Sequence, residues 1–176
     1  MITTDINQLR IVANKREYER LRADANYTNV KFDDKIGGLL AIHKDHQFDK
    51  KKGWYEEVVQ NIGYKNGYSV ILGSETGKED GARYTEGWWN NLPFEIASTE
   101  TGTKNNIKKG LKHCASKRET EIAVLFFPND NFDIRVFNDA LAMYNGLKKL
   151  NNGQYKQFHK IICISGGNII YKKTHP

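Results

Sequence analysis

Two histidines, His43 and His46, stand three residues apart and are followed by three consecutive lysines at residues 50–52. Histidine is the one side chain whose unperturbed pKa, about 6.5, lets it give or take a proton near neutral pH. Two such groups beside lysines could cleave an RNA backbone without a metal. One would remove the 2′-hydroxyl proton, the other would protonate the leaving oxygen, and a cation would stabilise the phosphorane. The competing interpretation is a polar surface turn between two elements.

A second group of candidates lies on a helix expected over residues 104–114. Ile107, Leu111 and Cys114 form its apolar face, whereas its lysines recur at four-residue spacing with no acidic residue among them. Like charges at this spacing repel each other. A solvated face is the ordinary explanation, and a surface that binds phosphates is the functional one. The predicted nucleic-acid contacts on this helix are Lys104, Lys108, Lys109, Lys112 and His113.

A third group lies in residues 81–97, where two strands flank a turn expected at residues 90–93. Trp88 could stack on a base, an interaction worth about 1–3 kcal/mol. Neighbouring Trp88 and Trp89 point to opposite faces of a strand, so one is expected in the core and the other partly exposed. Glu95 points opposite Phe94 and Ile96, as a general base or as the group that orients a histidine or an arginine. The predicted catalytic residues are His43, His46, Arg83 and Glu95, with Lys44, Lys52 and Trp88 as further nucleic-acid contacts.

The elements that would position these residues follow from the spacing of apolar residues. Asp5 or Thr4 is expected to cap a helix over residues 5–24. The patterns predict further helices and short strands along the rest of the chain. Together they indicate an α+β fold in a single domain, with a central, mostly antiparallel sheet, amphipathic helices packed on it and an accessory N-terminal helix. The predicted division is residues 1–29 for the helix and linker and residues 30–176 for the main domain. The expected helices are 5–24, 54–63, 104–114 and 132–147, and the expected strands are 30–32, 39–42, 68–72, 82–89, 94–98, 121–127, 160–164 and 169–172.

Length and composition are consistent with one soluble domain. The chain has 176 residues, enough to bury a core, and a mean hydropathy of −0.68. No apolar run is long enough to span a membrane, and no secretory signal opens the sequence. Cys114 and Cys163 lack metal-ligand spacing and are expected in the core of a reduced protein. A cytoplasmic location is therefore predicted, with phage delivery or export without a cleaved signal as alternatives. The net charge of +6 favours a polyanionic partner.

Several of these segments together resemble the nuclease-like toxin domain at the C-terminus of phage minor head (MuF-type) proteins. That domain is assigned to the Barnase–EndoU–colicin E5/D–RelE group of metal-independent ribonucleases. The resemblance implies an RNA-cleaving toxin, with tRNA among the candidate substrates, that acts by 2′-hydroxyl transesterification and uses no metal or cofactor. It also implies a monomer, with an immunity protein as a candidate partner. The likeness rests on residues 43–49, 52–56, 86–90, 94–97, 105–107, 112–117 and 126–128.

A rival interpretation uses the same region. One helix, three strands, a helix and a strand is also the core order of the PD-(D/E)xK nucleases. Related C-terminal toxins of contact-dependent inhibition systems place an acidic residue on the second strand and Glu-x-Lys on the third. Glu86 and Glu95 stand where those carboxylates would be, but Ala97 occupies the position of the lysine. Two carboxylates could hold Mg²⁺, whereas no group in the motif would activate the water.

Two further alternatives stay open. His43 and His46 could ligate zinc, although the sequence offers no evident third or fourth ligand. The non-enzymatic alternative is a domain of a phage or mobile element that binds nucleic acid or a protein partner, with structural histidines.

Overall fold

The computed structural model of the chain describes residues 5–51, 53–75, 85–150 and 155–175. It divides into two compact units, which are described separately. Unit 1 comprises Met1–Gly77 with Gly87–Asn91, and unit 2 comprises Lys78–Glu86 with Leu92–Pro176. The expected mixture of helices and strands, with helices packed on the strands, is confirmed. Within the described ranges, no helix is long and apolar enough to cross a membrane.

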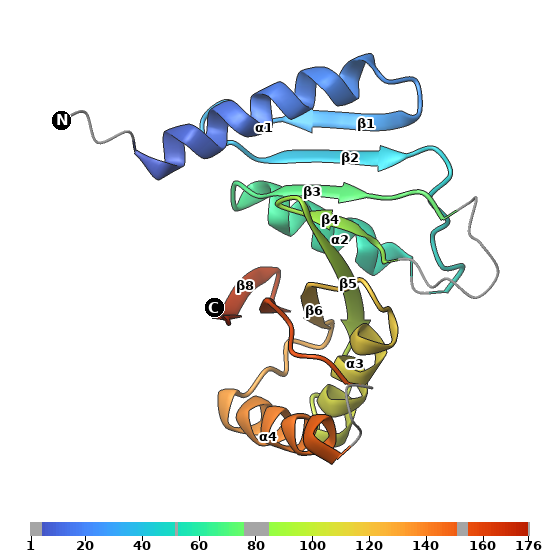
Figure 1. Ribbon diagram of the computed structural model, residues 1–176, viewed down its shortest axis with the longest axis vertical. Helices are drawn as coiled ribbons and strands as arrows, with labels where there is room; N and C mark the ends of the chain where they lie inside the picture. Colours follow the sequence, from blue (N-terminus) through green and yellow to red (C-terminus); the bar gives the residue numbers. More distant parts are fainter. Residues whose placement is uncertain (1–4, 52, 76–84, 151–154, 176) are drawn as a thin grey trace. The chain divides into compact units, whose positions relative to one another are not determined.

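Unit 1 begins with a helix that lies beside its first strands (Figure 1). The Asp5 carboxylate caps this helix by accepting a hydrogen bond from the Asn7 N–H at 3.0 Å, as the sequence predicts. Near its other end the helix buries Leu21 in a cluster with Leu39, Ala41 and Ile71. The helix therefore shares the core of unit 1. The elements of unit 1 are α1 (Ile6–Ala23), β1 (Tyr27–Phe32), β2 (Leu39–His43), α2 (Trp54–Lys65), β3 (Ser69–Leu72) and β4 (Gly87–Trp89).

Helix α2 connects β2 to β3 and is hydrogen-bonded to both strands. The buried Gln60 amide donates hydrogen bonds to the carbonyls of Ala41 on β2 and Val70 on β3, at 2.8 and 3.0 Å. On the same helix, Gly63 lies so close to the strands that an added Cβ would come within 2.5 Å of a Val70 methyl group. A larger residue at position 63 would therefore force α2 away from β3.

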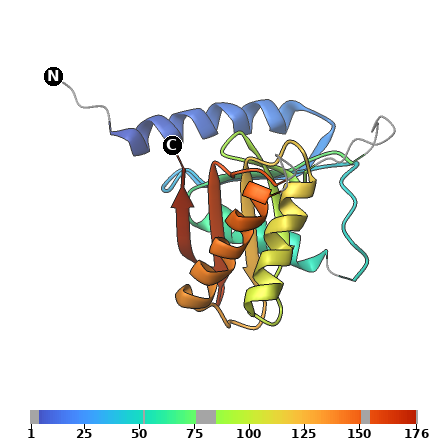
Figure 2. The same ribbon diagram turned by 60° about the horizontal axis from the view of Figure 1, so that its bottom comes forward.

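Unit 2 is a run of three parallel strands closed by an antiparallel hairpin. Its helices α3 and α4 lie side by side and bury their apolar faces against the strands (Figure 2). All six residues of β6 are buried, as expected of a central strand in a parallel arrangement. The elements of unit 2 are β5 (Leu92–Ser98), α3 (Lys104–Ser116), β6 (Ile122–Phe127), α4 (Ile134–Leu150), β7 (Lys160–Ser165) and β8 (Asn168–Thr174).

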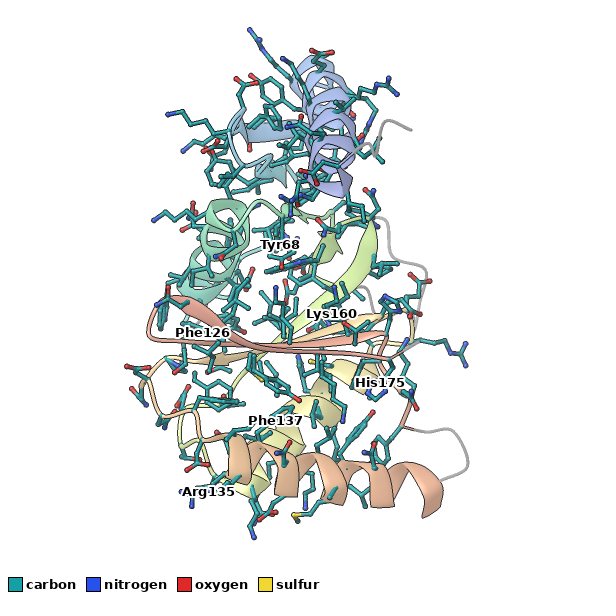
Figure 3. The ribbon with its side chains drawn as sticks, turned by 90° about the vertical axis from the view of Figure 1, so that its left-hand side faces the viewer. Tyr68, Phe126, Arg135, Phe137, Lys160 and His175 are labelled. Atoms are coloured by element: carbon teal, nitrogen blue, oxygen red, sulfur yellow. The ribbon has the colours of Figure 1, made fainter. Side chains whose placement is uncertain are left out.

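Helix α4 has one face buried in the core of unit 2 and one face in contact with solvent. Phe137 points toward the strands and is fully buried, whereas Arg135 points away and pairs with Asp133 at the surface (Figure 3). The Phe137 ring lies 4.9 Å from that of Tyr171 on β8, centroid to centroid. Aromatic contacts thus join the last helix to the last strand.

The strands of each unit pair in both directions. The β1–β2, β3–β4 and β7–β8 pairs are antiparallel, whereas β2–β3, β5–β6 and β6–β7 are parallel. Parallel neighbours need a long crossover connection, and α2, α3 and α4 each supply one. The apolar helices between strands were therefore the signal for parallel pairing.

Candidate active site on strand β5 and helix α3

Glu95 is a buried carboxylate on β5. Phe94 and Ile96 point to one face of the strand, so Glu95 and Ala97 point to the other, where α3 packs. The Glu95 side chain is only 1% exposed. A buried charge is costly unless it is paired and hydrogen-bonded. Its partners therefore indicate what the residue does.

Both partners of Glu95 come from the C-terminal end of α3. The Nε2 atom of His113 lies 2.9 Å from Glu95 Oε1, and the Nζ atom of Lys117 lies 3.4 Å from the same oxygen. His113 and Lys117 are four residues apart, which places them on the same side of the helix end. The geometry thus places an imidazole and an ammonium on one carboxylate oxygen.

The hydrogen bond to Glu95 determines how His113 presents its ring. An ionised carboxylate only accepts, so Nε2 must carry a proton and donate it toward Glu95. The other ring nitrogen, Nδ1, then belongs to a side chain that is 52% exposed. A carboxylate that orients an imidazole in this way is the arrangement of a general acid–base dyad. The contact with His113 is the one that the predicted role of orienting a histidine requires of Glu95.

The second oxygen of Glu95 sets the site apart from a purely structural ion pair. Glu95 Oε2 is buried and has no hydrogen-bond partner within the described ranges. Leaving such an acceptor unsatisfied costs about 1–3 kcal/mol, more for a charged group. Folding does not require a buried carboxylate oxygen without a hydrogen-bond partner. Oε2 of Glu95 is therefore a candidate contact for a ligand.

Glu86, the second carboxylate of the rival motif, lies beside β5 in unit 2. Its backbone N–H donates to the Phe94 carbonyl at 3.0 Å. Burial raises the pKa of the Cys114 thiol well above its ordinary value, and the charges of Glu95 and Glu86 raise it further. Cys114 is therefore a neutral core thiol and not a nucleophile. Because the charges of Glu95 and Glu86 both raise the pKa of this thiol, both carboxylates lie near it.

Ala97 cannot be replaced by the lysine of the Glu-x-Lys motif without moving α3. Its Cβ would lie 3.2 Å from a Cβ added to Gly110, so strand and helix are in close contact there. Lys117 brings an ammonium to Glu95 from the helix instead. The positive charge at Glu95 thus comes from the end of α3 and not from the residue two positions after the glutamate.

The basic residues of α3, predicted as nucleic-acid contacts, form two rows. Lys104 pairs with Asp139 of α4 at 3.5 Å, and Lys112 lies over the ring of Tyr155 with its Nζ 5.4 Å from the centroid. Lys108 falls between them at helical spacing. The other row consists of Lys109, His113 and Lys117, each one turn from the next. Only this second row includes the group bound to Glu95.

His46 does not have the geometry of the proton-transfer group that the sequence predicts. Its side chain is fully buried, with Nδ1 2.9 Å from the Gly73 carbonyl and Nε2 2.8 Å from Glu56 Oε2. Burial alone lowers the pKa of His46, but the hydrogen bonds to Glu56 and Gly73 and the charges of Glu56 and Glu75 outweigh it. The pKa of His46 is therefore raised above its ordinary value. Neither ring nitrogen is available to a substrate, so the role of His46 is to join the loop after β2 to α2 and to the end of β3.

The other described residues among those predicted, namely His43, Lys44 and Trp88, belong to unit 1. His43 Nδ1 accepts a hydrogen bond from the Asp45 N–H at 3.1 Å, and its ring meets the Tyr27 ring edge to face. Because both ring nitrogens of the buried His46 are occupied, the two histidines do not form the predicted proton-transfer pair. Lys44 is exposed. Arg83 and Lys52 lie outside the described residues.

Trp88 and Trp89 on β4 confirm the expected alternation. Trp89 is buried and Trp88 is 41% exposed.

The sequence does not predict that Glu95, His113 and Lys117 come together in one site. The only signal for it in the sequence is that His113 and Lys117 are one helical turn apart.

Comparison of the chain with protein-family models, with curated proteins and with solved structures finds no match. Function is therefore inferred from the geometry of the two units.

Proposed function

We propose that the chain is a metal-independent endoribonuclease in which His113, oriented by Glu95, moves the proton. The observation that carries this proposal is the 2.9 Å contact between His113 Nε2 and a carboxylate that is 1% exposed. This contact leaves Nδ1 of a half-exposed ring to act as a base. The buried His46 has no ring nitrogen that a substrate could reach. Lys109 and Lys117 flank His113 along α3, and the chain has a net charge of +6. These charges suit a polyanionic substrate.

In the proposed reaction His113 Nδ1 removes the proton of an RNA 2′-hydroxyl. The 2′ oxygen then forms a bond to the adjacent phosphorus, and the bond from phosphorus to the 5′ oxygen breaks. The products are a 2′,3′-cyclic phosphate and a 5′-hydroxyl whose proton comes from solvent. Glu95 stabilises the imidazolium that forms, and Lys109 and Lys117 stabilise the charge that develops on the phosphorane. General base catalysis of this kind contributes about 10²–10⁴-fold.

The test is cleavage of total tRNA, ribosomal RNA and duplex DNA by the purified chain in the presence of EDTA. Cleavage restricted to RNA, with 2′,3′-cyclic phosphate ends, is expected. His113→Ala should reduce the rate at least about 100-fold. His159→Ala is the matched control, because His159 is an exposed histidine of unit 2 that directly precedes β7 and makes no contact with Glu95 in the described residues. Undiminished cleavage by His113→Ala would refute the assignment.

A second candidate is metal-dependent cleavage by a PD-(D/E)xK-like site, and the buried second oxygen of Glu95 favours it. The chain has the required element order from α2 through β3, β4 and β5 to α3 and β6, with β5 and β6 parallel. In this alternative Glu86 and Glu95 would hold the cation, and Lys117 would take the place of the lysine absent at Ala97. A bound Mg²⁺ would supply an activated water and charge stabilisation. Loss of cleavage in EDTA and its recovery with Mg²⁺ would select this candidate over the first.

The remaining expectations depend on this activity. A ribonuclease toxin would act on RNA in the cytoplasm, and an immunity protein would inhibit it by covering the row formed by Lys109, His113 and Lys117. Absence of cleavage with every nucleic acid, with and without Mg²⁺, would instead favour a domain that only binds nucleic acid or a protein partner.

A further inference from the structure

A pocket of about 280 Å³ opens on unit 1, whereas Glu95, His113 and Lys117 belong to unit 2. Its walls come from the C-terminal half of α1, the start of β1, strands β3 and β4, and the turn after β4. A pocket for a drug-sized ligand occupies roughly 300–1,000 Å³, so this one suits a single ring system. The residues that line it are Glu17, Arg20, Tyr27, Ile71, Trp88 and Asn91.

Trp88 gives the pocket a flat apolar wall. Its strand position is directly opposite Ile71 in the β3–β4 pair, and its ring packs over Gly73, where an added Cβ would come within 3.0 Å of Trp88 Cζ3. The absence of a side chain at Gly73 therefore lets the indole lie close to β3. Because 41% of Trp88 stays exposed, part of this aromatic surface is accessible from the pocket. Tyr27, held edge to face against the His43 ring at 5.1 Å, adds a second aromatic group.

The polar part of the lining combines different hydrogen-bonding groups. Arg20 Nε and one terminal nitrogen donate to the two oxygens of Glu17 at 2.9 and 2.6 Å, which holds both side chains in place. The Arg20 side chain nevertheless stays 56% exposed. Asn91 supplies an amide, which both donates and accepts. A carboxylate, a guanidinium and an amide around an aromatic wall match a planar ligand with donors and acceptors on its edge.

We propose that this pocket binds one base of a single-stranded nucleic acid, stacked on Trp88, with the neighbouring phosphate at Arg20. The proposal rests on the proposed action on RNA and specifies how such a strand is held. Indole stacking suits any base, because every base has a π-face. Guanidinium groups bind phosphate through charge-assisted hydrogen bonds. The base must be unstacked to enter, so single strands are bound and duplexes are not.

The test compares two fluorescein-labelled deoxyoligonucleotides of equal length and charge, one with bases and one built entirely of abasic units. Deoxyribose lacks the 2′-hydroxyl, so anisotropy measures binding without the proposed cleavage. The strand with bases should bind about 5- to 150-fold more tightly than the abasic strand. Trp88→Ala should bring both strands to the abasic affinity, whereas Trp88→Phe should keep most of the difference. Trp54→Ala removes an exposed tryptophan of α2 outside the pocket, so it should not change the difference in affinity between the two strands.

Equal affinity for the two strands, or unchanged binding by Trp88→Ala, would overturn the proposal, as would tight binding of a blunt duplex. Trp88→Phe guards against a folding defect, because it keeps an aromatic ring at the position. The two proposals fail separately. Cleavage of RNA without base-dependent binding would disprove the pocket alone, and base-dependent binding without cleavage would disprove the ribonuclease alone.

Discussion

Glu95 on β5 accepts a hydrogen bond from Nε2 of His113 on α3 at 2.9 Å, and it does so from a position that is 1% exposed. The contact joins a carboxylate that solvent does not reach to an imidazole that solvent does reach. The parallel β5–α3–β6 crossover makes it feasible, because it packs the end of α3 against the side-chain row of β5 that contains Glu95 and Ala97.

Replacing Glu95 by Gln tests whether the carboxylate orients and charges the histidine. The amide oxygen of Gln can still accept from Nε2, but the negative charge that stabilises the imidazolium is lost. We expect cleavage to fall by about 10²–10⁴-fold with little change in the folded structure. The rate of RNA cleavage and the circular dichroism spectrum measure the two effects. A variant that cleaves at the wild-type rate would make the contact structural only.

The two rows of lysines on α3 should differ in their effect on cleavage. Lys109→Gln and Lys117→Gln remove charge next to His113, so each should slow cleavage about tenfold or more. Lys104→Gln and Lys112→Gln are matched controls that remove the same charge from the row in contact with Asp139 and Tyr155. They should change the rate only through general attraction of RNA, and that change should disappear at high salt. Equal losses in both rows at high salt would contradict a localised site.

Breaking the buried pair of His46 and Glu56 should destabilise unit 1. Glu56→Gln leaves the buried imidazole without its counter-charge, which typically costs about 3–5 kcal/mol. Urea denaturation of the variant should therefore show a clearly lower midpoint. Glu57→Gln, on the same turn of α2 but exposed, is the control and should leave the midpoint nearly unchanged. A small effect at Glu56 would show that the pair adds little to stability.

The same pair predicts a pH dependence of stability. The pKa of His46 is raised in the folded state, so the folded protein binds the proton more tightly than the unfolded chain does. The stabilisation is complete below the unfolded pKa of about 6.5 and is lost as the pH rises through the higher folded value. The free energy of unfolding of the wild type should decline across that window, and His46→Gln should flatten the decline. Unfolding curves at a series of pH values above 6 measure it, and an equal slope in both proteins would exclude His46 as its source.

Local features of the fold were predictable because they depend on neighbouring residues. The Asp5 cap, strand β6 and the alternation of Trp88 with Trp89 each follow from short-range spacing. The direction of Glu95, opposite to that of Phe94 and Ile96, follows from the two-residue period of a strand. These features were confirmed.

The partners of these side chains were not predictable, because they depend on tertiary contacts. The close spacing of His43 and His46 suggested shared chemistry, yet nothing in that spacing indicates that Glu56 and Gly73 occupy both nitrogens of His46. In the same way, His113 is 18 residues from Glu95 along the chain and reaches it only through the packing of α3 on β5. Burial, which separates a structural histidine from a reactive one, is a property of the folded unit.

The most direct test of the central claim is cleavage of total tRNA in EDTA by the wild type and by His113→Ala, with the 3′ ends of the products identified. The ribonuclease proposal predicts 2′,3′-cyclic phosphate ends from the wild type, a rate lower by about 100-fold or more in His113→Ala, and wild-type cleavage by His159→Ala. Cleavage that requires Mg²⁺, or cleavage that His113→Ala leaves unchanged, would contradict it.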